Sequence, residues 1–258
     1  DDIHDLVEWV GTQPWCSGRV GLDGVSYLAL SQYKVAALNP PHLAAICPWE
    51  GFSDLYRDFV RPGGVREDGF SIIWSRMTRR AARVSGDLRA EVVARPERDD
   101  WYAAVTPELE RIEVPMLVCG SFSDHSLHTR GSFEAFRRSG SERRWLYTHR
   151  SGKWSTYYGA EASEVRARFF DHVLKDADNG WDAEPASVVR PDLCEGSLDN
   201  ILLVNSLSKR SNMAGYRAGY LAGDAGLITE LLEVRKHSGM MVPTPIQAAM
   251  VAALGDQD

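Results

Sequence analysis

The sequence lacks the long apolar runs of membrane proteins and the dense cysteine pattern of small disulfide-rich domains. No apolar run approaches the roughly 20 residues that a membrane-spanning helix needs. The first residues are acidic, where a secretory signal peptide would be basic and then apolar. The four cysteines form no C-x-x-C pair and are far apart in the chain, at Cys16, Cys47, Cys119 and Cys194. We therefore predict reduced thiols, no metal site, no membrane partner and a cytoplasmic location.

Positive charge is also sparse. The 258 residues include 29 Lys and Arg against 36 Asp and Glu, which gives a net charge of -7. The arginines occur in pairs, such as Arg79-Arg80 and Arg137-Arg138, rather than in a basic stripe, so we expect no nucleic-acid partner. The hydrophobic share of 44% is typical of globular proteins, and the length allows one large α/β domain or two small ones.

Short apolar runs alternate with longer amphipathic ones up to about residue 175. This pattern is typical of β-α units around a parallel sheet. The expected strands are 19–25, 43–48, 114–120 and 144–149. The segment between residues 51 and 113 has irregular apolar spacing and is rich in Arg, Asp and Trp, which predicts a helical cap that shapes a pocket. The chain begins on a helical pattern instead of a leading strand, as an internal fragment would.

The pattern changes after Lys175. Residues 176–185 are polar and carry no periodicity, which indicates a loop or a domain boundary. Beyond them we expect a strand at 201–204 and helices at 225–237 and 245–254. This part predicts a second, smaller α/β piece.

The run Gly24-Val25-Ser26-Tyr27 lies between an expected strand and an expected helix. A sharp strand-to-helix turn of this kind lifts a serine oxygen clear of the sheet and exposes it as a nucleophile. Leu28 breaks the usual G-x-S-x-G pattern, and the motif alone is equally typical of a structural serine. The setting favours Ser26 as a nucleophile, with the backbone N–H of Tyr27 as one oxyanion donor.

Asp124 follows the third expected strand of the sheet, and His149 stands at the end of the fourth. An α/β hydrolase orders its triad as Ser, then Asp or Glu, then His, with acid and base in loops after later strands. We therefore predict that His149 takes the proton of Ser26 and that Asp124 orients His149. A helix cap or turn residue is the alternative interpretation of Asp124. His125 and His128 follow no later strand, and we expect them on a loop or helix surface.

Several short motifs run along the first part of the chain: Glu8-Trp9-Val10, Gln13-Pro14-Trp15, Gly18-Arg19-Val20-Gly21-Leu22, Gly24-Val25-Ser26-Tyr27-Leu28-Ala29, Trp49-Glu50-Gly51, Tyr147-Thr148-His149, Lys153-Trp154 and Phe169-Phe170-Asp171-His172. They closely resemble the X-Pro dipeptidyl-peptidase and cocaine-esterase-like α/β hydrolases over residues 1–181. The resemblance implies a Ser26, Asp124 and His149 triad without a cofactor, acting on a small ester or a short peptide. A member of this family would add strands before residue 1, with a tyrosine that is the second oxyanion donor, and a β-rich domain at the other end. We therefore expect a truncated sheet of doubtful activity, whose exposed edges favour self-association.

A second set of residues suits a different chemistry. Ser206, Ser208, Lys209 and Arg217 offer an amine for an aldehyde cofactor, together with hydroxyls and a guanidinium for its phosphate. A surface loop with a lone lysine is the alternative. The run from Ser206 to Gly219, with the segments 234–237 and 243–247, resembles fold-type I aminotransferases, most closely the succinyldiaminopimelate aminotransferases. The resemblance covers about residues 180–258 and implies that Lys209 carries pyridoxal phosphate, held by Ser206, Ser208 and Arg217.

The two resemblances meet within residues 180–185. We therefore predict a chimera of a hydrolase core fragment, residues 1–181, and an aminotransferase-like fragment, residues 182–258, joined by recombination or sequence assembly. No phosphate-binding glycine loop, pyridine-binding aspartate or stacking aromatic precedes Lys209, so we expect slight cofactor affinity. A serine hydrolase is the leading hypothesis. A pyridoxal-phosphate aminotransferase fragment and a non-catalytic chimera are the alternatives.

Overall fold

The computed structural model describes residues 2–81, 83, 86–122, 124, 127–184, 187–189, 202–206, 219–223, 225–237 and 244–255. The chain divides into two compact units. The first comprises Asp1–Pro62 and Arg66–Leu193, and the second comprises Gly63–Val65 and Cys194–Asp258. None of the helices in the described part of the chain has the length and apolar character needed to cross a bilayer.

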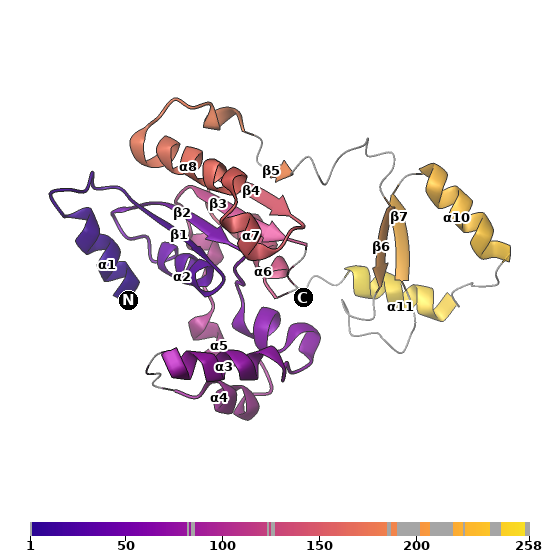
Figure 1. Ribbon diagram of the computed structural model, residues 1–258. Helices are drawn as coiled ribbons and strands as arrows, with labels where there is room; N and C mark the ends of the chain where they lie inside the picture. Colours follow the sequence, from indigo (N-terminus) through magenta and orange to yellow (C-terminus); the bar gives the residue numbers. More distant parts are fainter. Residues whose placement is uncertain are drawn as a thin grey trace. The chain divides into compact units, whose positions relative to one another are not determined.

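A parallel sheet of five strands forms the centre of the first unit (Figure 1). Its strands lie side by side in chain order: β1 (Val20–Val25), β2 (Leu43–Trp49), β3 (Met116–Ser121), β4 (Arg144–His149) and β5 (Ser187–Val189). The first four confirm the predicted strands, whereas β5 was not predicted. Val25 pairs with Trp49, and Ser121 pairs with His149, so strands end level with their neighbours. The loops that follow β1 to β4 therefore meet at one edge of the sheet, as in other open α/β folds.

Side chains of the sheet alternate between two hydrophobic clusters. In β3, Met116 and Val118 belong to one cluster, and Leu117 and Cys119 belong to the other. This alternation is the period of two expected for a strand. Helices α1 (Asp2–Gly11), α2 (Tyr27–Ala36) and α6 (Thr129–Arg138) contribute to the first cluster, and α8 (Ala160–Lys175) contributes to the second. Helices thus cover both faces of the sheet, and the predicted α/β fold class is confirmed.

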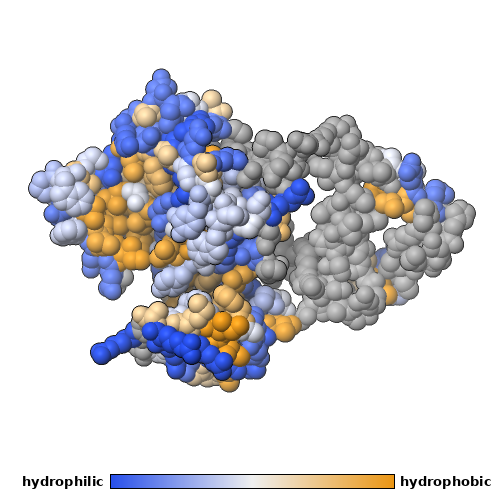
Figure 2. Space-filling view, in the orientation of Figure 1, coloured by the Kyte–Doolittle hydropathy of each residue, from blue (hydrophilic) through white to orange (hydrophobic). Residues whose placement is uncertain are grey.

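The described residues between β2 and β3 form helices and no strand. These are η1 (Leu55–Val60), η2 (Pro62–Gly64), α3 (Phe70–Ala81), α4 (Leu88–Ala94), α5 (Asp100–Val105) and η3 (Leu109–Arg111). Asp54, Asp87 and Asp99 each accept backbone N–H bonds at the start of η1, α4 and α5, so aspartate caps define where these helices begin. Figure 2 shows apolar and strongly hydrophilic residues side by side over this helical segment, at the bottom of the view.

Two short helical pieces complete the described part of the first unit, and the described residues from 202 onward form a hairpin and two helices. In the first unit, α7 spans Lys153–Tyr157 and η4 spans Trp181–Ala183. In the second, β6 (Leu202–Ser206) pairs antiparallel with β7 (Gly219–Gly223), and α10 (Ala225–His237) and α11 (Thr244–Gly255) follow the predicted ranges closely.

Candidate active site

Ser26 sits in a strained turn between β1 and α2. Its backbone has φ 63° and ψ -113°, and its N–H donates to the carbonyl of Trp49 at 3.0 Å. A positive φ is rare for a residue with a side chain and occurs where a turn must be very tight. A Cβ added at Gly24 would lie 2.6 Å from the Cβ of Leu28, so only glycine fits before this turn. The sequence therefore builds the sharp elbow that was predicted, even with Leu28 in place of the usual glycine.

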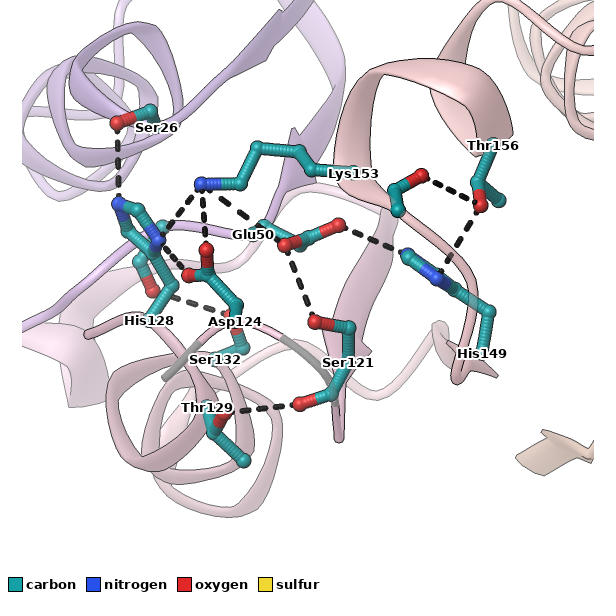
Figure 3. A network of polar contacts seen from close by, with 12 residues as sticks. Ser26, Glu50, Ser121, Asp124, His128, Thr129, Ser132, His149, Lys153 and Thr156 are labelled. Atoms are coloured by element: carbon teal, nitrogen blue, oxygen red, sulfur yellow. Dashed lines mark hydrogen bonds and ion pairs between the residues drawn. The ribbon is translucent and has the colours of Figure 1, made fainter. Parts of the chain in front are cut away.

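The hydroxyl of Ser26 faces the ring of His128. Ser26 Oγ lies 3.0 Å from His128 Nε2, and Asp124 Oδ2 contacts the other ring nitrogen, Nδ1 (Figure 3). His128 is the residue before α6 and is only 1% exposed. Its ring stacks on Phe52 with the ring centroids 6.1 Å apart. Ser26, His128 and Asp124 thus form a continuous chain of polar contacts at the edge where the strands end.

The structure corrects the predicted place of His149. Its Nε2 lies 2.8 Å from Glu50 Oε1, and its Nδ1 lies 3.1 Å from the carbonyl oxygen of Ser151. Both ring nitrogens are therefore engaged away from Ser26, and His128 occupies the place expected for His149. The physical reason is the buried carboxylate of Glu50: a buried charge needs a close partner, and His149 at the end of β4 supplies it.

The expectation that His128 lies on a surface is likewise wrong: it lies in the loop before α6, but it is buried. His125 lies outside the described residues. Asp124 and His128 are four residues apart in the loop that leads into α6, and their side chains are in contact. This Asp-x-x-x-His spacing is the signal in the sequence that would have pointed to His128.

Glu50 begins the loop after β2 and is fully buried. Its backbone also has a positive φ, 48°, and its N–H donates to the carbonyl of Cys119 at 2.9 Å. Ser121 donates its hydroxyl to Glu50 Oε2 at 3.1 Å, while His149 contacts Oε1. Both carboxylate oxygens are thus held, and Glu50 with His149 forms a second imidazole–carboxylate pair beside the first.

Lys153, the first residue of α7, lies between the two pairs (Figure 3). Its Nζ is 2.8 Å from Asp124 Oδ1, 3.1 Å from His128 Nδ1 and 4.0 Å from Glu50 Oε2. Burial raises the pKa of the Asp124 carboxyl, but the hydrogen bonds and charges of His128 and Lys153 outweigh burial and hold that pKa below its usual value. Asp124 is therefore held as an acceptor for both neighbours.

Contacts with the loops after β2 and β3 fix the start of α6, next to His128. Thr129 donates its hydroxyl to the carbonyl of Ser121 at 2.8 Å, and Ser132 donates to the carbonyl of Gly51 at 3.1 Å. A Cβ at Gly131 would lie 2.4 Å from the backbone nitrogen of Ser53, which is too close for any side chain. This tight approach of α6 sets the height of His128 above the sheet.

Among the described residues, two groups of side chains place potential metal ligands within 4.8 Å of one another. The first is Glu50, Cys119 and His149, and the second is Glu50, Asp124 and His128. In the first group, Glu50 and His149 already contact each other at 2.8 Å, and burial raises the pKa of the Cys119 thiol well above its usual value. In the second group the ammonium of Lys153 already supplies a positive charge to the carboxylates. The donor chemistry of neither group suits a resident metal ion.

The described cysteines carry free thiols, as predicted. Cys16, Cys47 and Cys119 form no disulfide, and Cys194 lies outside the described residues. Burial also raises the pKa of the Cys47 thiol, so neither buried cysteine offers a thiolate nucleophile.

The predicted cofactor residues fall almost wholly outside the described residues. Ser208, Lys209 and Arg217 are among those that the structure does not describe, and Ser206 is described only as the last backbone position of β6. The pyridoxal phosphate site therefore stays a prediction.

The first part of the chain is similar to known hydrolases. Residues 1–103 match the family model of the X-Pro dipeptidyl-peptidases (S15 family). The cocaine esterase of Rhodococcus sp. (strain MB1 Bresler) is 36% identical over 97 residues, which cover 37% of this chain and 16% of that enzyme. The crystal structure of a CocE/NonD family hydrolase from Staphylococcus aureus superposes with a TM-score of 0.70 and 39% identity, covering 73% of this chain and 35% of the other.

The last part of the chain is similar to aminotransferases. Residues 178–258 match the family model of aminotransferase class I and II. A probable aminotransferase of Mycobacterium tuberculosis (strain ATCC 25618 / H37Rv) is 62% identical over 77 residues, which cover 30% of this chain and 18% of that protein. The chain thus spans about a third or less of the length of each of these relatives. The two predicted resemblances are confirmed: the chain joins a part similar to S15-type α/β hydrolases to a part similar to class I and II aminotransferases.

Proposed function

We propose that the first unit is a serine hydrolase that cleaves an ester or amide acyl bond. Ser26 is the nucleophile, His128 the general base and Asp124 the residue that orients His128. The observation that carries this proposal is the 3.0 Å contact between Ser26 Oγ and His128 Nε2 at a strained elbow. The similarity to S15 peptidases and to cocaine esterase supports the hydrolase class.

The geometry suits acyl transfer in two steps. With the Nδ1 proton of His128 directed at Asp124, Nε2 is free to accept the proton of the Ser26 hydroxyl. The bond from Ser26 Oγ to the acyl carbon forms, the bond to the leaving oxygen or nitrogen breaks, and His128 passes the proton to that leaving atom. Water then attacks the acyl-serine, giving a proton to His128 and releasing the acid, while Ser26 regains its hydrogen.

The start of α2 supplies the electrostatic support for this reaction. Tyr27 is the first residue of α2, and the first N–H groups of a helix have no acceptor within the helix. The N–H of Tyr27 therefore serves as an oxyanion donor, helped by the positive end of the helix dipole. We propose a small ester or a short peptide as the substrate class.

A fluorophosphonate probe tests this proposal on the full chain. We expect the wild-type protein to be labelled at Ser26, identified by mass spectrometry of the modified peptide, and Ser26→Ala to lose the label. Ser31→Ala is the matched control, because Ser31 lies on the same helix and its exposed hydroxyl donates only to the carbonyl of Leu28. Its labelling should equal that of the wild type. A wild-type protein that takes no label would contradict the proposal of a serine hydrolase, and the non-catalytic chimera would remain as the interpretation of the first unit.

The aminotransferase match carries a second candidate function. The 62% identity over 77 residues favours a lysine that holds pyridoxal phosphate in the last part of the chain. Lys209 would hold the cofactor, Ser206, Ser208 and Arg217 would hold its phosphate, and the cofactor would supply an electron sink for amino-group chemistry. Borohydride reduction in the presence of pyridoxal phosphate, followed by mass spectrometry, tests whether Lys209 gains the cofactor. An unmodified Lys209 at saturating cofactor would rule out this candidate.

A further inference from the structure

We propose that Lys153 is a positioning residue for the hydrolase site: its ammonium holds Asp124 in register with His128 and is itself anchored by the buried Glu50–His149 pair. The inference rests on the proposed function. It assigns a task to three polar residues that take no direct part in the reaction.

The two oxygens of Asp124 have separate partners. Oδ2 contacts His128 Nδ1, and Oδ1 lies 2.8 Å from Lys153 Nζ. A carboxylate held at one oxygen only can rotate about its terminal torsion, which is broad for aspartate. The second contact, from Lys153, removes that freedom and keeps Oδ2 aimed at the imidazole.

The position of Lys153 is fixed in turn by the second pair. Glu50 is fully buried, and its Oε2 lies 4.0 Å from Lys153 Nζ. His149 and Ser121 hold Glu50 at 2.8 Å and 3.1 Å. The side chain of Lys153 is itself only 15% exposed, so solvent screens these charges weakly. The contacts therefore run without a break from His149 through Glu50, Lys153, Asp124 and His128 to Ser26.

Lys153 contacts the imidazole as well as the carboxylate. Its Nζ lies 3.1 Å from His128 Nδ1 and 2.8 Å from Asp124 Oδ1. The ammonium therefore meets both members of the Asp124–His128 pair and fixes how they lie relative to each other.

The test measures the rate of fluorophosphonate labelling at neutral pH for the full chain and its variants. Lys153→Met keeps most of the side-chain volume and removes the charge, and Lys153→Arg keeps the charge. We expect Lys153→Met to label about 10- to 100-fold more slowly, which is the usual cost of losing a residue that orients a ligand or catalytic group without reacting itself. Lys153→Arg should restore most of the rate.

Lys175→Met is the matched control, because Lys175 lies at the exposed end of α8 and pairs with Asp171. It should behave as the wild type. Equal losses in Lys153→Met and Lys153→Arg would reduce Lys153 to a packing role and overturn the inference.

A second measurement separates this inference from the proposed hydrolase. Proton NMR detects the Nδ1–H of an imidazole bonded to a carboxylate at low field, and His128→Gln identifies the resonance by its loss. In Lys153→Met the resonance should broaden or move upfield as Asp124 loses its second contact. If the wild type takes no label, the hydrolase proposal fails, and the NMR result still decides the role of Lys153. A resonance that is unchanged in Lys153→Met would overturn the positioning role.

Discussion

Two imidazole–carboxylate pairs lie side by side in this protein, and only one of them meets a nucleophile. His128 with Asp124 and His149 with Glu50 use the same two functional groups at hydrogen-bonding distance. The second nitrogen of His128 faces the hydroxyl of Ser26 at the strained elbow. That of His149 faces the backbone carbonyl of Ser151 and the buried hydroxyl of Thr156, away from the elbow. Whether such a pair can activate a nucleophile is therefore decided by the group that contacts its second ring nitrogen.

The largest expected effect separates the pairs by reactivity. His128→Gln should slow fluorophosphonate labelling of Ser26 by at least about 1,000-fold, because the loss of the base removes general-base activation of the nucleophile. The labelling rate measured at neutral pH checks this. His149→Gln provides the contrast and should keep a measurable rate. If it loses as much activity as His128→Gln while it stays folded, the assignment of the base to His128 is wrong.

The next effect separates the pairs by stability. His149→Leu leaves the carboxylate of Glu50 buried without its imidazole partner, which costs about 3–5 kcal/mol of the free energy of unfolding. Urea unfolding followed by tryptophan fluorescence measures this cost for the first unit, because all eight tryptophans lie in it. The double variant His149→Leu with Glu50→Gln should recover part of the loss, since the buried charge is then removed. A single variant as stable as the wild type would mean that the Glu50–His149 pair does not stabilise the fold.

The smallest expected effect is on the free energy of unfolding at acidic pH. The pKa of Asp124 is lowered in the folded protein, so the carboxylate adds stability that is fully present above its unfolded pKa of about 3.9. That contribution is lost as the pH falls through the lower folded value. The free energy of unfolding of Asp124→Asn should therefore fall less steeply than that of the wild type below about pH 4. Parallel curves for the two proteins would show that Asp124 is not held as a carboxylate by Lys153 and His128.

Local sequence patterns were sufficient to predict most of the sheet. The four apolar runs that became β1 to β4 are bounded by polar loops. The residues of β2, β3 and β4 are buried on both faces, as helices on both sides require, whereas β1 is buried only at its end. The three residues of β5 are too short for a periodicity to be read. They lie beyond the predicted boundary at residue 181, yet they pair with β4.

Only part of the site was predicted, because the order of residues along the chain does not determine which of them are in contact in the folded protein. The elbow at Ser26 and the acid at Asp124 follow from strand ends, which the apolar pattern locates. The base was assigned to His149 because it closes the last predicted strand, but a buried Glu50 lies opposite and takes its ring. A local sequence pattern does not show that the Glu50 carboxylate becomes buried when the chain folds. Nor does it show that α6 packs so closely against the loop after β2 that His128 reaches Ser26.

Ser26 and Glu50 share one more property, a left-handed backbone at the end of adjacent strands. Each such residue costs on the order of 1–3 kcal/mol, which glycine would relieve. Selection for heat resistance alone would therefore favour glycine at Ser26 and erase the nucleophile, whereas Glu50 is retained by its buried contacts with His149 and Ser121. Substitutions meant to make the protein more resistant to heat should therefore be placed at exposed apolar residues of α3, such as Ile73 and Met77. Polar replacements there leave the reacting groups unchanged.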